Sequence, residues 1–148
     1  MDINRNAPAT AVGELRIDAD PETVFSVISD IDAWPSWNAD VTSASLDGPL
    51  RPETVFRWKS GRAALVSTLR VVDPYREIAW TGTTLGIRAI HVFRFQSLDG
   101  GTFAQSEESW EGWIPRVLPG YSRRTLDKGI GNVLAQLKVE AERRAAAT

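Results

Sequence analysis

The chain has one histidine, His91, which stands in an alternating segment where it could carry a proton. Histidine has the unperturbed pKa nearest neutrality, so His91 is the first candidate for a general acid or base. Glu108, in another alternating segment, could charge-pair with His91 across adjacent strands, giving a dyad able to move a proton near a carbonyl. We favour the alternative in which His91 is a hydrogen-bonded residue of a cavity wall, because one inward histidine is not a mechanism.

Other chemistry finds little support in the residue types. Without cysteine there is no disulfide, no thiolate metal site and no cysteine nucleophile. The sequence has no Gly-x-Ser-x-Gly turn and no glycine-rich loop that would cradle phosphate before a helix. The acidic side chains of Glu107, Glu108 and Glu111 lack the spacing of a calcium loop, and their strand pattern is more typical of a solvated face or strand edge. We therefore expect neither a metal ion nor an organic cofactor.

Length and charge restrict the class of protein. A chain of 148 residues is close to the commonest size of a single domain. Its 17 basic and 19 acidic side chains form no basic stripe, so nucleic acid is not an expected partner. We expect a flexible tail over residues 1–10 and a single domain over residues 11–148. Monomer and homodimer are both compatible with the sequence.

The same scan predicts no integral membrane span. No apolar run approaches the ~20 residues that a bilayer requires, and residues 1–10 lack the apolar stretch of a signal peptide. A soluble protein in the cytoplasm is the expectation that follows.

Periodicity predicts which elements position the candidate residues. Residues 12–18 alternate as a half-buried strand, and Asp20-Pro21-Glu22 is typical of a helix start. A short helical turn or loop is expected at Trp34 to Trp37. Six further strands are predicted at residues 40–46, 54–60, 62–72, 77–82, 87–97 and 102–113. Apolar residues spaced by three and four then predict a long amphipathic helix from Ser122 to Arg144.

The predicted elements imply a cavity. Seven strands at ~4.8 Å spacing are far wider than one helix of ~10–12 Å, so the sheet must curl around the helix and leave space that side chains fill poorly. Alternation assigns the aromatic faces inward; in the last strand, where either face could point inward, we assign Glu108 and Trp110 there. The predicted ligand contacts are Phe56, Trp58, Trp80, His91, Phe93, Trp110, Leu126 and Ile130. The tryptophans among them could equally fill the core or stack on a planar ligand.

Several local phrases resemble one known superfamily over nearly the whole chain. They occupy residues 17–25, 31–38, 72–80 and 107–112, and include Asp20-Pro21-Glu22 and Trp34-Pro35-Ser36-Trp37. In these phrases and in element order the chain resembles the START-like, or SRPBCC, superfamily, most of all bacterial members of the polyketide cyclase/dehydrase type and the lipid-transport type. The resemblance implies an α+β helix-grip fold: a curved seven-stranded antiparallel sheet around a long C-terminal helix, with two short helical segments between the first two strands.

The resemblance also implies a hydrophobic cavity, which members of the superfamily use to bind sterols, lipids, hormones or polyketides and in some cases to cyclise or hydrolyse them. It transfers no catalytic residue to this sequence. The leading hypothesis is a carrier or sensor of a small hydrophobic molecule, aromatic, polycyclic or lipid-like. One alternative is an enzyme of the cyclase or dehydratase type that uses His91 for proton transfer. Another is a protein-interaction module that uses the outer face or an edge strand of the sheet.

Overall fold

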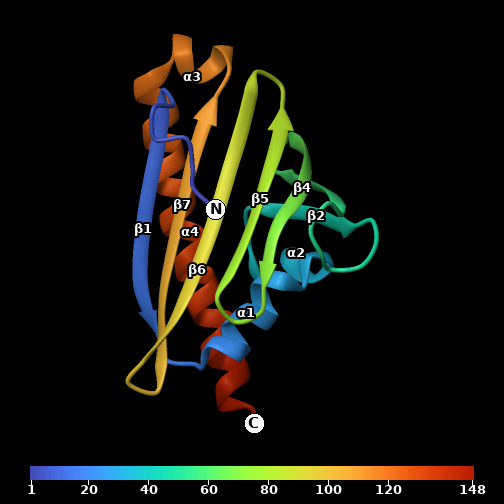
Figure 1. Cartoon of the computed structure of the whole chain (residues 1–148), viewed down its shortest axis with the longest axis vertical. Coiled ribbons are helices and arrows are strands. Elements are labelled where there is room, and N and C mark those ends of the chain that lie inside the picture. The colour runs from blue at the N-terminus through green and yellow to red at the C-terminus, as the bar shows by residue number, and fades with distance from the viewer.

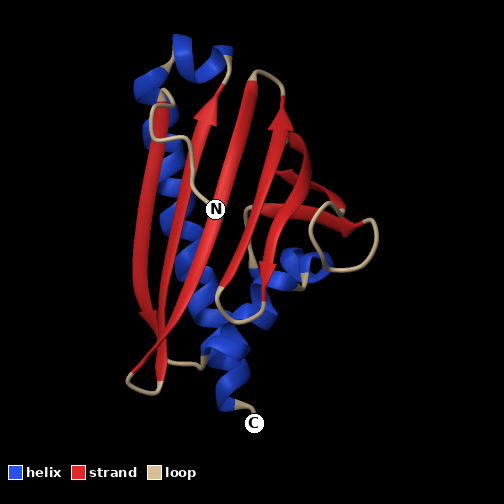
Figure 2. Ribbon diagram, in the orientation of Figure 1, coloured by secondary structure: helices blue, strands red, loops and turns tan.

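A long C-terminal helix lies across one face of a twisted, curved sheet (Figures 1 and 2). The computed structural model describes residues 1–148. The elements are β1 (Ala9–Ile17), α1 (Pro21–Ser29), a 3-10 turn η1 (Ile31–Ala33), α2 (Trp34–Trp37), β2 (Val41–Leu46), β3 (Val55–Ser60), β4 (Ala63–Asp73), β5 (Glu77–Thr84), β6 (Ile87–Leu98), β7 (Gly101–Glu111), α3 (Trp113–Val117) and α4 (Pro119–Ala146).

The sheet has seven antiparallel strands in the order β1-β7-β6-β5-β4-β3-β2. Strands β2 to β7 therefore form a meander, and β1 pairs with β7 at the far edge. Helix α4 packs mainly against β1, while α1 and α2 close the end of the sheet near the C-terminus of α4 (Figure 1). These features confirm the predicted α+β helix-grip fold.

Helix α1 begins where the sequence predicts, because Asp20 caps it. The Asp20 carboxylate accepts a hydrogen bond from the backbone N–H of Thr23 at 2.8 Å, and this bond lowers the pKa of that carboxyl. Pro21 occupies the first turn, where its missing N–H costs nothing. The apolar face of the helix, with Val24 and Val27, is buried in the main core.

The end of the last strand differs from the prediction. Strand β7 stops at Glu111, and Gly112 then turns the chain with a φ of 114°. A side chain at Gly112 would collide with the carbonyl oxygen of Gly86, so the turn requires glycine. Trp113 consequently starts the short helix α3, which the alternating pattern does not predict, and α4 begins at Pro119 rather than Ser122.

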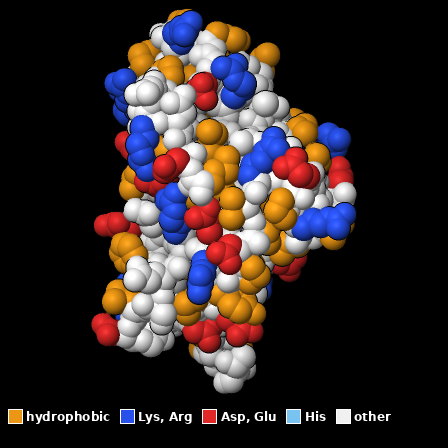
Figure 3. Space-filling view, viewed as in Figure 1, with side chains coloured by type: hydrophobic (Ala, Val, Ile, Leu, Met, Phe, Trp, Pro, Cys, Tyr) orange, Lys and Arg blue, Asp and Glu red, His pale blue; other side chains and the backbone are white.

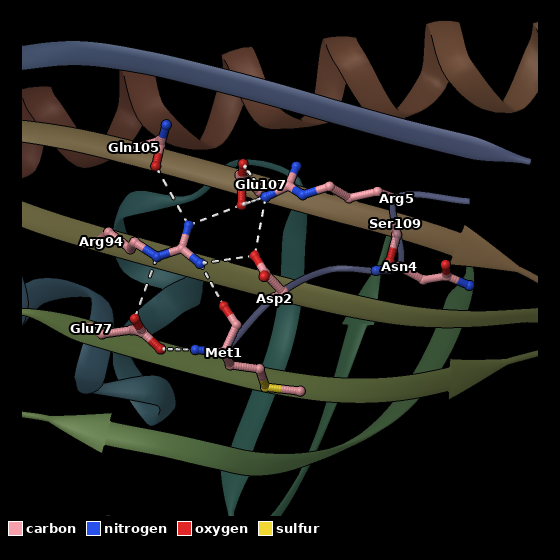
Figure 4. Close-up of polar contacts among 9 residues, drawn as sticks. All are labelled: Met1, Asp2, Asn4, Arg5, Glu77, Arg94, Gln105, Glu107 and Ser109. Carbon is pink, nitrogen blue, oxygen red and sulfur yellow. Dashed lines mark hydrogen bonds and ion pairs between the residues drawn. The ribbon is translucent and has the colours of Figure 1, made fainter. Parts of the chain in front are cut away.

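Residues 1–7 lie across the outer face of the sheet, over β5, β6 and β7 (Figure 4). Ile3 is buried there against Ala79 and Val92, and strand β1 begins at Ala9, earlier than predicted. Arg94, on the same face, contacts the carboxylates of Glu77 and Glu107 at 3.4 and 2.9 Å. Whether residues 1–10 are flexible stays a prediction.

Glu107 corrects another expectation. The sequence favours a solvated face for this carboxylate, but its side chain is only 7% exposed. The N-terminal segment covers it, and Arg5 and Arg94 neutralise its charge at 3.3 and 2.9 Å. The prediction that Glu107 is solvated was therefore wrong. The segment that covers it lies more than 100 residues away in the sequence, so the local charge pattern does not indicate it.

Helix α4 packs closely over β1 at Gly13. A Cβ added there would lie 2.7 Å from Cγ2 of Ile130 and 3.0 Å from Cδ1 of Leu134. By contrast, a Cβ at Gly129 or Gly131 would meet no atom within 4 Å. The helix glycines therefore do not mark a close contact, and the glycine of β1 does.

We expect Gly13→Val to lower the free energy of unfolding by about 1–3 kcal/mol, because the added methyl groups would push α4 off β1. The matched control is Gly131→Ala, which should raise the free energy of unfolding by up to about 1 kcal/mol through helix propensity. Urea denaturation of the three proteins measures both effects. Equal stability of wild type and Gly13→Val would contradict the close packing.

Candidate ligand-binding cavity

A cavity of about 510 Å³ lies between the concave face of the sheet and α4. It is lined by 25 residues, of which 15 are hydrophobic. The aromatic residues of the wall are Trp34, Trp37, Trp58, Trp80, Phe93, Trp110 and Tyr121. This volume and lining are typical of sites for small organic ligands, which combine a mainly apolar wall with a few polar groups.

The structure brings together most of the predicted ligand contacts. Six of the eight predicted contacts line the cavity: Trp58, Trp80, His91, Phe93, Trp110 and Leu126. Phe56 and Ile130 point inward, as predicted, but lie behind the wall. Phe56 is fully buried, with Trp34 and Trp80 at centroid distances of 5.5 and 5.6 Å. Ile130 fills the space above Gly13.

Hydrogen bonds fix the orientation of several indoles. Trp34 donates from Nε1 to the carbonyl of Ile28 at 2.9 Å, and Trp58 donates to the hydroxyl of Ser67 at 3.1 Å. The Nε1 of Trp37 has no hydrogen-bond partner although it is buried.

His91 packs against two aromatic rings and is only 8% exposed. Its ring centroid is 4.6 Å from that of Phe93, in a stacked arrangement, and 5.0 Å from that of Trp80. This environment disfavours a charged imidazole. Burial accordingly lowers the pKa of His91 below its ordinary value of 6.5, and the carboxylate of Glu108 opposes that shift only in part.

The predicted contact between His91 and Glu108 is present. The two residues are paired across β6 and β7, with Nδ1 of His91 3.3 Å from Oε1 of Glu108. The carboxylate of Glu108 beside Nδ1 favours the neutral tautomer that carries its proton on this nitrogen. Trp110 donates from Nε1 to the other oxygen of Glu108 at 2.9 Å and so holds the carboxylate in place.

Ser106 is a further partner, one that the sequence analysis missed. Its hydroxyl oxygen lies 2.8 Å from Nε2 of His91, and in the tautomer above the hydroxyl donates. The order serine, histidine, carboxylate matches a hydrolytic triad, but Ser106 is fully buried and does not line the cavity. It therefore orients the imidazole and is not placed to attack a ligand. Its position two residues before Glu108, on the same strand face, was the available signal.

Polar residues at the β2–β3 edge of the cavity were also missed. They are Asn38, Asp40, Ser60 and Arg62. The backbone N–H of Gly61 donates to the carbonyl of Asp40 at 3.1 Å, which joins the β3–β4 turn to the loop after α2. Arg62 forms no ion pair within the chain. Turn residues escape the alternation rule, which is why the sequence pattern does not place them.

A second hollow of about 560 Å³ lies on the outer face of the sheet. Only three of its nine lining residues are hydrophobic, and it is an open groove beside Tyr75 and Arg76. Its wall shares no residue with that of the inner cavity. We take the inner cavity as the candidate site because it is the less open of the two and has the aromatic wall.

No group of three or more His, Asp or Glu side chains lies close enough together to hold a metal ion. None of the helices combines the length and the apolar character needed to cross a bilayer.

Comparison with protein families assigns the chain. The profile of the family described as "Polyketide cyclase / dehydrase and lipid transport" matches residues 8–144. The chain belongs to this family. The match spans every strand and all but the end of α4, so family membership rests on the whole helix-grip architecture. No curated protein sequence is significantly similar to the chain.

Solved structures share the fold of this family member at low sequence identity. A START superfamily protein from Mycobacterium smegmatis is 19% identical, with 93% of this chain and 97% of that chain covered and a TM-score of 0.72. Protein TTHA0849 from Thermus thermophilus is 16% identical, with coverage of 94% and 99% and a TM-score of 0.78. The di-domain ARO/CYC BexL from the BE-7585A biosynthetic pathway is 22% identical, with coverage of 97% and 52% and a TM-score of 0.74. The chain thus spans about half of that di-domain protein.

Burial of His91 predicts a pH dependence of stability. Below pH 6.5, the ordinary pKa of histidine, the unfolded chain binds a proton that folded His91 does not. The free energy of unfolding should therefore fall as pH drops from 6.5 toward the lower folded pKa, by at most about 1.4 kcal/mol per pH unit. In His91→Gln, which can still bond Ser106, this part of the slope should disappear. Urea denaturation between neutral pH and pH 5 tests this, and parallel slopes in the two proteins would contradict it.

Proposed function

We propose that this protein binds a small hydrophobic molecule with an aromatic or polycyclic body in the inner cavity, as a carrier or sensor. The observation that carries the proposal is the wall of indole and phenyl rings around a space of about 510 Å³. Such rings offer large apolar surfaces that stack on planar ligands. The family description, which includes lipid transport, and the name of BexL as an ARO/CYC protein support a ligand of this class.

The polar groups of the wall favour a ligand that carries oxygen atoms. Glu108 can accept a hydrogen bond at one side of the cavity, while the guanidinium N–H donors of Arg62 lie at the β2–β3 edge. A hydroxyl or phenol would suit Glu108, and a carbonyl or carboxylate would suit the donors. A plain hydrocarbon would leave these groups unpaired, at a cost in affinity.

Filling the cavity should weaken binding. Ala89 lines the cavity on β6, whereas Ala64 is exposed on the outer face of β4. We expect Ala89→Phe to bind the neutral polycyclic probe 1-aminoanthracene at least about tenfold more weakly than wild type, because the new ring occupies the ligand's space. The same substitution at Ala64 should leave the affinity unchanged. Fluorescence titration measures both, and equal affinities in all three proteins would mean that the probe binds elsewhere.

A second candidate is catalysis of the cyclase or dehydratase type. The specific observation in its favour is the contact between His91 and Glu108 inside an apolar wall. Neutral His91 beside an ionised carboxylate could accept a proton from an acidic C–H next to a carbonyl and return it to a leaving hydroxyl. Movement of the ring toward the ligand would be required, since Ser106 and Glu108 occupy its two nitrogens.

Substitution of the dyad distinguishes this candidate from simple binding. If the protein converts a synthetic poly-β-ketone thioester, His91→Gln and Glu108→Gln should each lower kcat/KM by about 10²–10⁴ while 1-aminoanthracene still binds. Glu14→Gln is the control, because Glu14 is exposed on the outer face of β1 and forms no ion pair. Chromatography of the products gives the rates. Turnover within about twofold of wild type in both dyad variants would remove the dyad from the mechanism.

A further inference from the structure

Large apolar side chains gather at the end of the molecule formed by α3. Five of them are exposed by between 49% and 81%: Leu85, Trp113, Val117, Leu118 and Tyr121. They come from the β5–β6 turn, from α3 and from the start of α4, and we call them the α3 patch. Single exposed apolar residues are normal on a protein surface, whereas a cluster of them at one end of the folded molecule is typical of an interaction surface.

The patch is held in place by local packing. The backbone N–H of Ile114 donates to the carbonyl of Gly86 at 3.2 Å, which joins the start of α3 to the β5–β6 turn. Within the five-residue helix α3, Pro115 is buried, whereas Trp113 and Val117 lie on the exposed side. Leu85, in the turn itself, is the most exposed large apolar residue of the chain at 81%. The fold therefore presents these side chains on a fixed scaffold.

Arginines flank the patch in the sequence. Residues 113–126 include Arg116, Arg123 and Arg124 and no acidic residue, although the whole chain has a formal net charge of −2. Arg116 and Arg124 form no ion pair, and Arg123 donates only to the backbone carbonyl of Pro8. Figure 3 shows basic and hydrophobic side chains together at this end, where Figure 1 places α3.

The patch also borders the inner cavity. Tyr121 belongs to both, and Thr84 and Ile87, on either side of the turn that holds Leu85, line the cavity wall. Thr125, one helical turn after Tyr121, is a further lining residue that is exposed at the surface. An apolar molecule could therefore move between the cavity and a surface in contact with the patch with little exposure of its apolar surface to water.

From these observations we propose that the α3 patch docks on the surface of an anionic lipid bilayer. The aliphatic and aromatic side chains would enter the boundary between headgroups and acyl chains, and the arginines would pair with anionic headgroups. Trp and Tyr are the aromatic residues that favour this interface. A symmetric dimer through the patch fits less well, because it would bring the arginines of both copies together. The docking does not depend on the proposed function, whereas its use for ligand transfer does.

Vesicle sedimentation tests the docking directly. Wild-type protein should sediment with vesicles of phosphatidylcholine that contain about one-third phosphatidylglycerol, bind weakly to pure phosphatidylcholine, and lose affinity in salt near 1 M. The double variant Trp113→Ser, Val117→Ser should bind at least about tenfold more weakly. Arg116→Gln, Arg124→Gln should weaken binding to the anionic vesicles and reduce the effect of salt.

The matched control is Val12→Ser, Val66→Ser, which removes two exposed apolar side chains from β1 and β4 and should leave vesicle binding unchanged. Circular dichroism and 1-aminoanthracene binding check that every variant keeps its fold and cavity. Failure of wild type to sediment with anionic vesicles, or equal sedimentation of the patch variant, would overturn the proposal. So would a patch-dependent dimer found by light scattering without vesicle binding. A wild-type protein that does not bind 1-aminoanthracene would instead count against the proposed function.

Discussion

A seven-stranded sheet is much wider than the one long helix that covers it, and this mismatch shapes the rest of the protein. At ~4.8 Å per strand the sheet would span roughly 34 Å if flat, whereas a helix with its side chains is ~10–12 Å across. Helix α4 packs on β1 at Gly13, and α1 and α2 close the end of the sheet near the C-terminus of α4. Side chains of β3 to β7 cover the concave face of the sheet but do not fill the space between it and α4, and this space is the cavity.

Within that apolar space the polar groups are few and mostly satisfied. His91 bonds Ser106 and contacts Glu108, whose other oxygen bonds Trp110. Each of these bonds offsets the cost of taking a polar group out of water, and together they fix the orientation of the imidazole. In the proposed function this network would offer a fixed acceptor to a ligand hydroxyl, and in the second candidate function it would transfer a proton. Geometry alone favours binding, since neither imidazole nitrogen points freely at the cavity.

The sequence predicts those features of the structure that depend on neighbouring residues, and it does not predict those that depend on turns or on distant segments. Alternation in β6 placed His91 and Phe93 correctly on the concave face, and Asp20 marked the start of α1, because neighbours in sequence carry both signals. Alternation cannot separate a wall residue from one behind it, so Phe56 was expected to contact ligand. It also says nothing of turns or distant partners, which is why α3, Arg62 and the burial of Glu107 under the N-terminal segment were missed.

Occupation of the inner cavity by a small hydrophobic molecule is the central claim, and native mass spectrometry tests it most directly. The protein is incubated with a panel of aromatic polyketides, sterols and fatty acids, and its native mass is compared with its denatured mass. We predict a one-to-one complex with at least one aromatic or polycyclic compound, weakened in the variant whose cavity is filled at Ala89. A native mass that equals the bare chain with every compound would contradict the account.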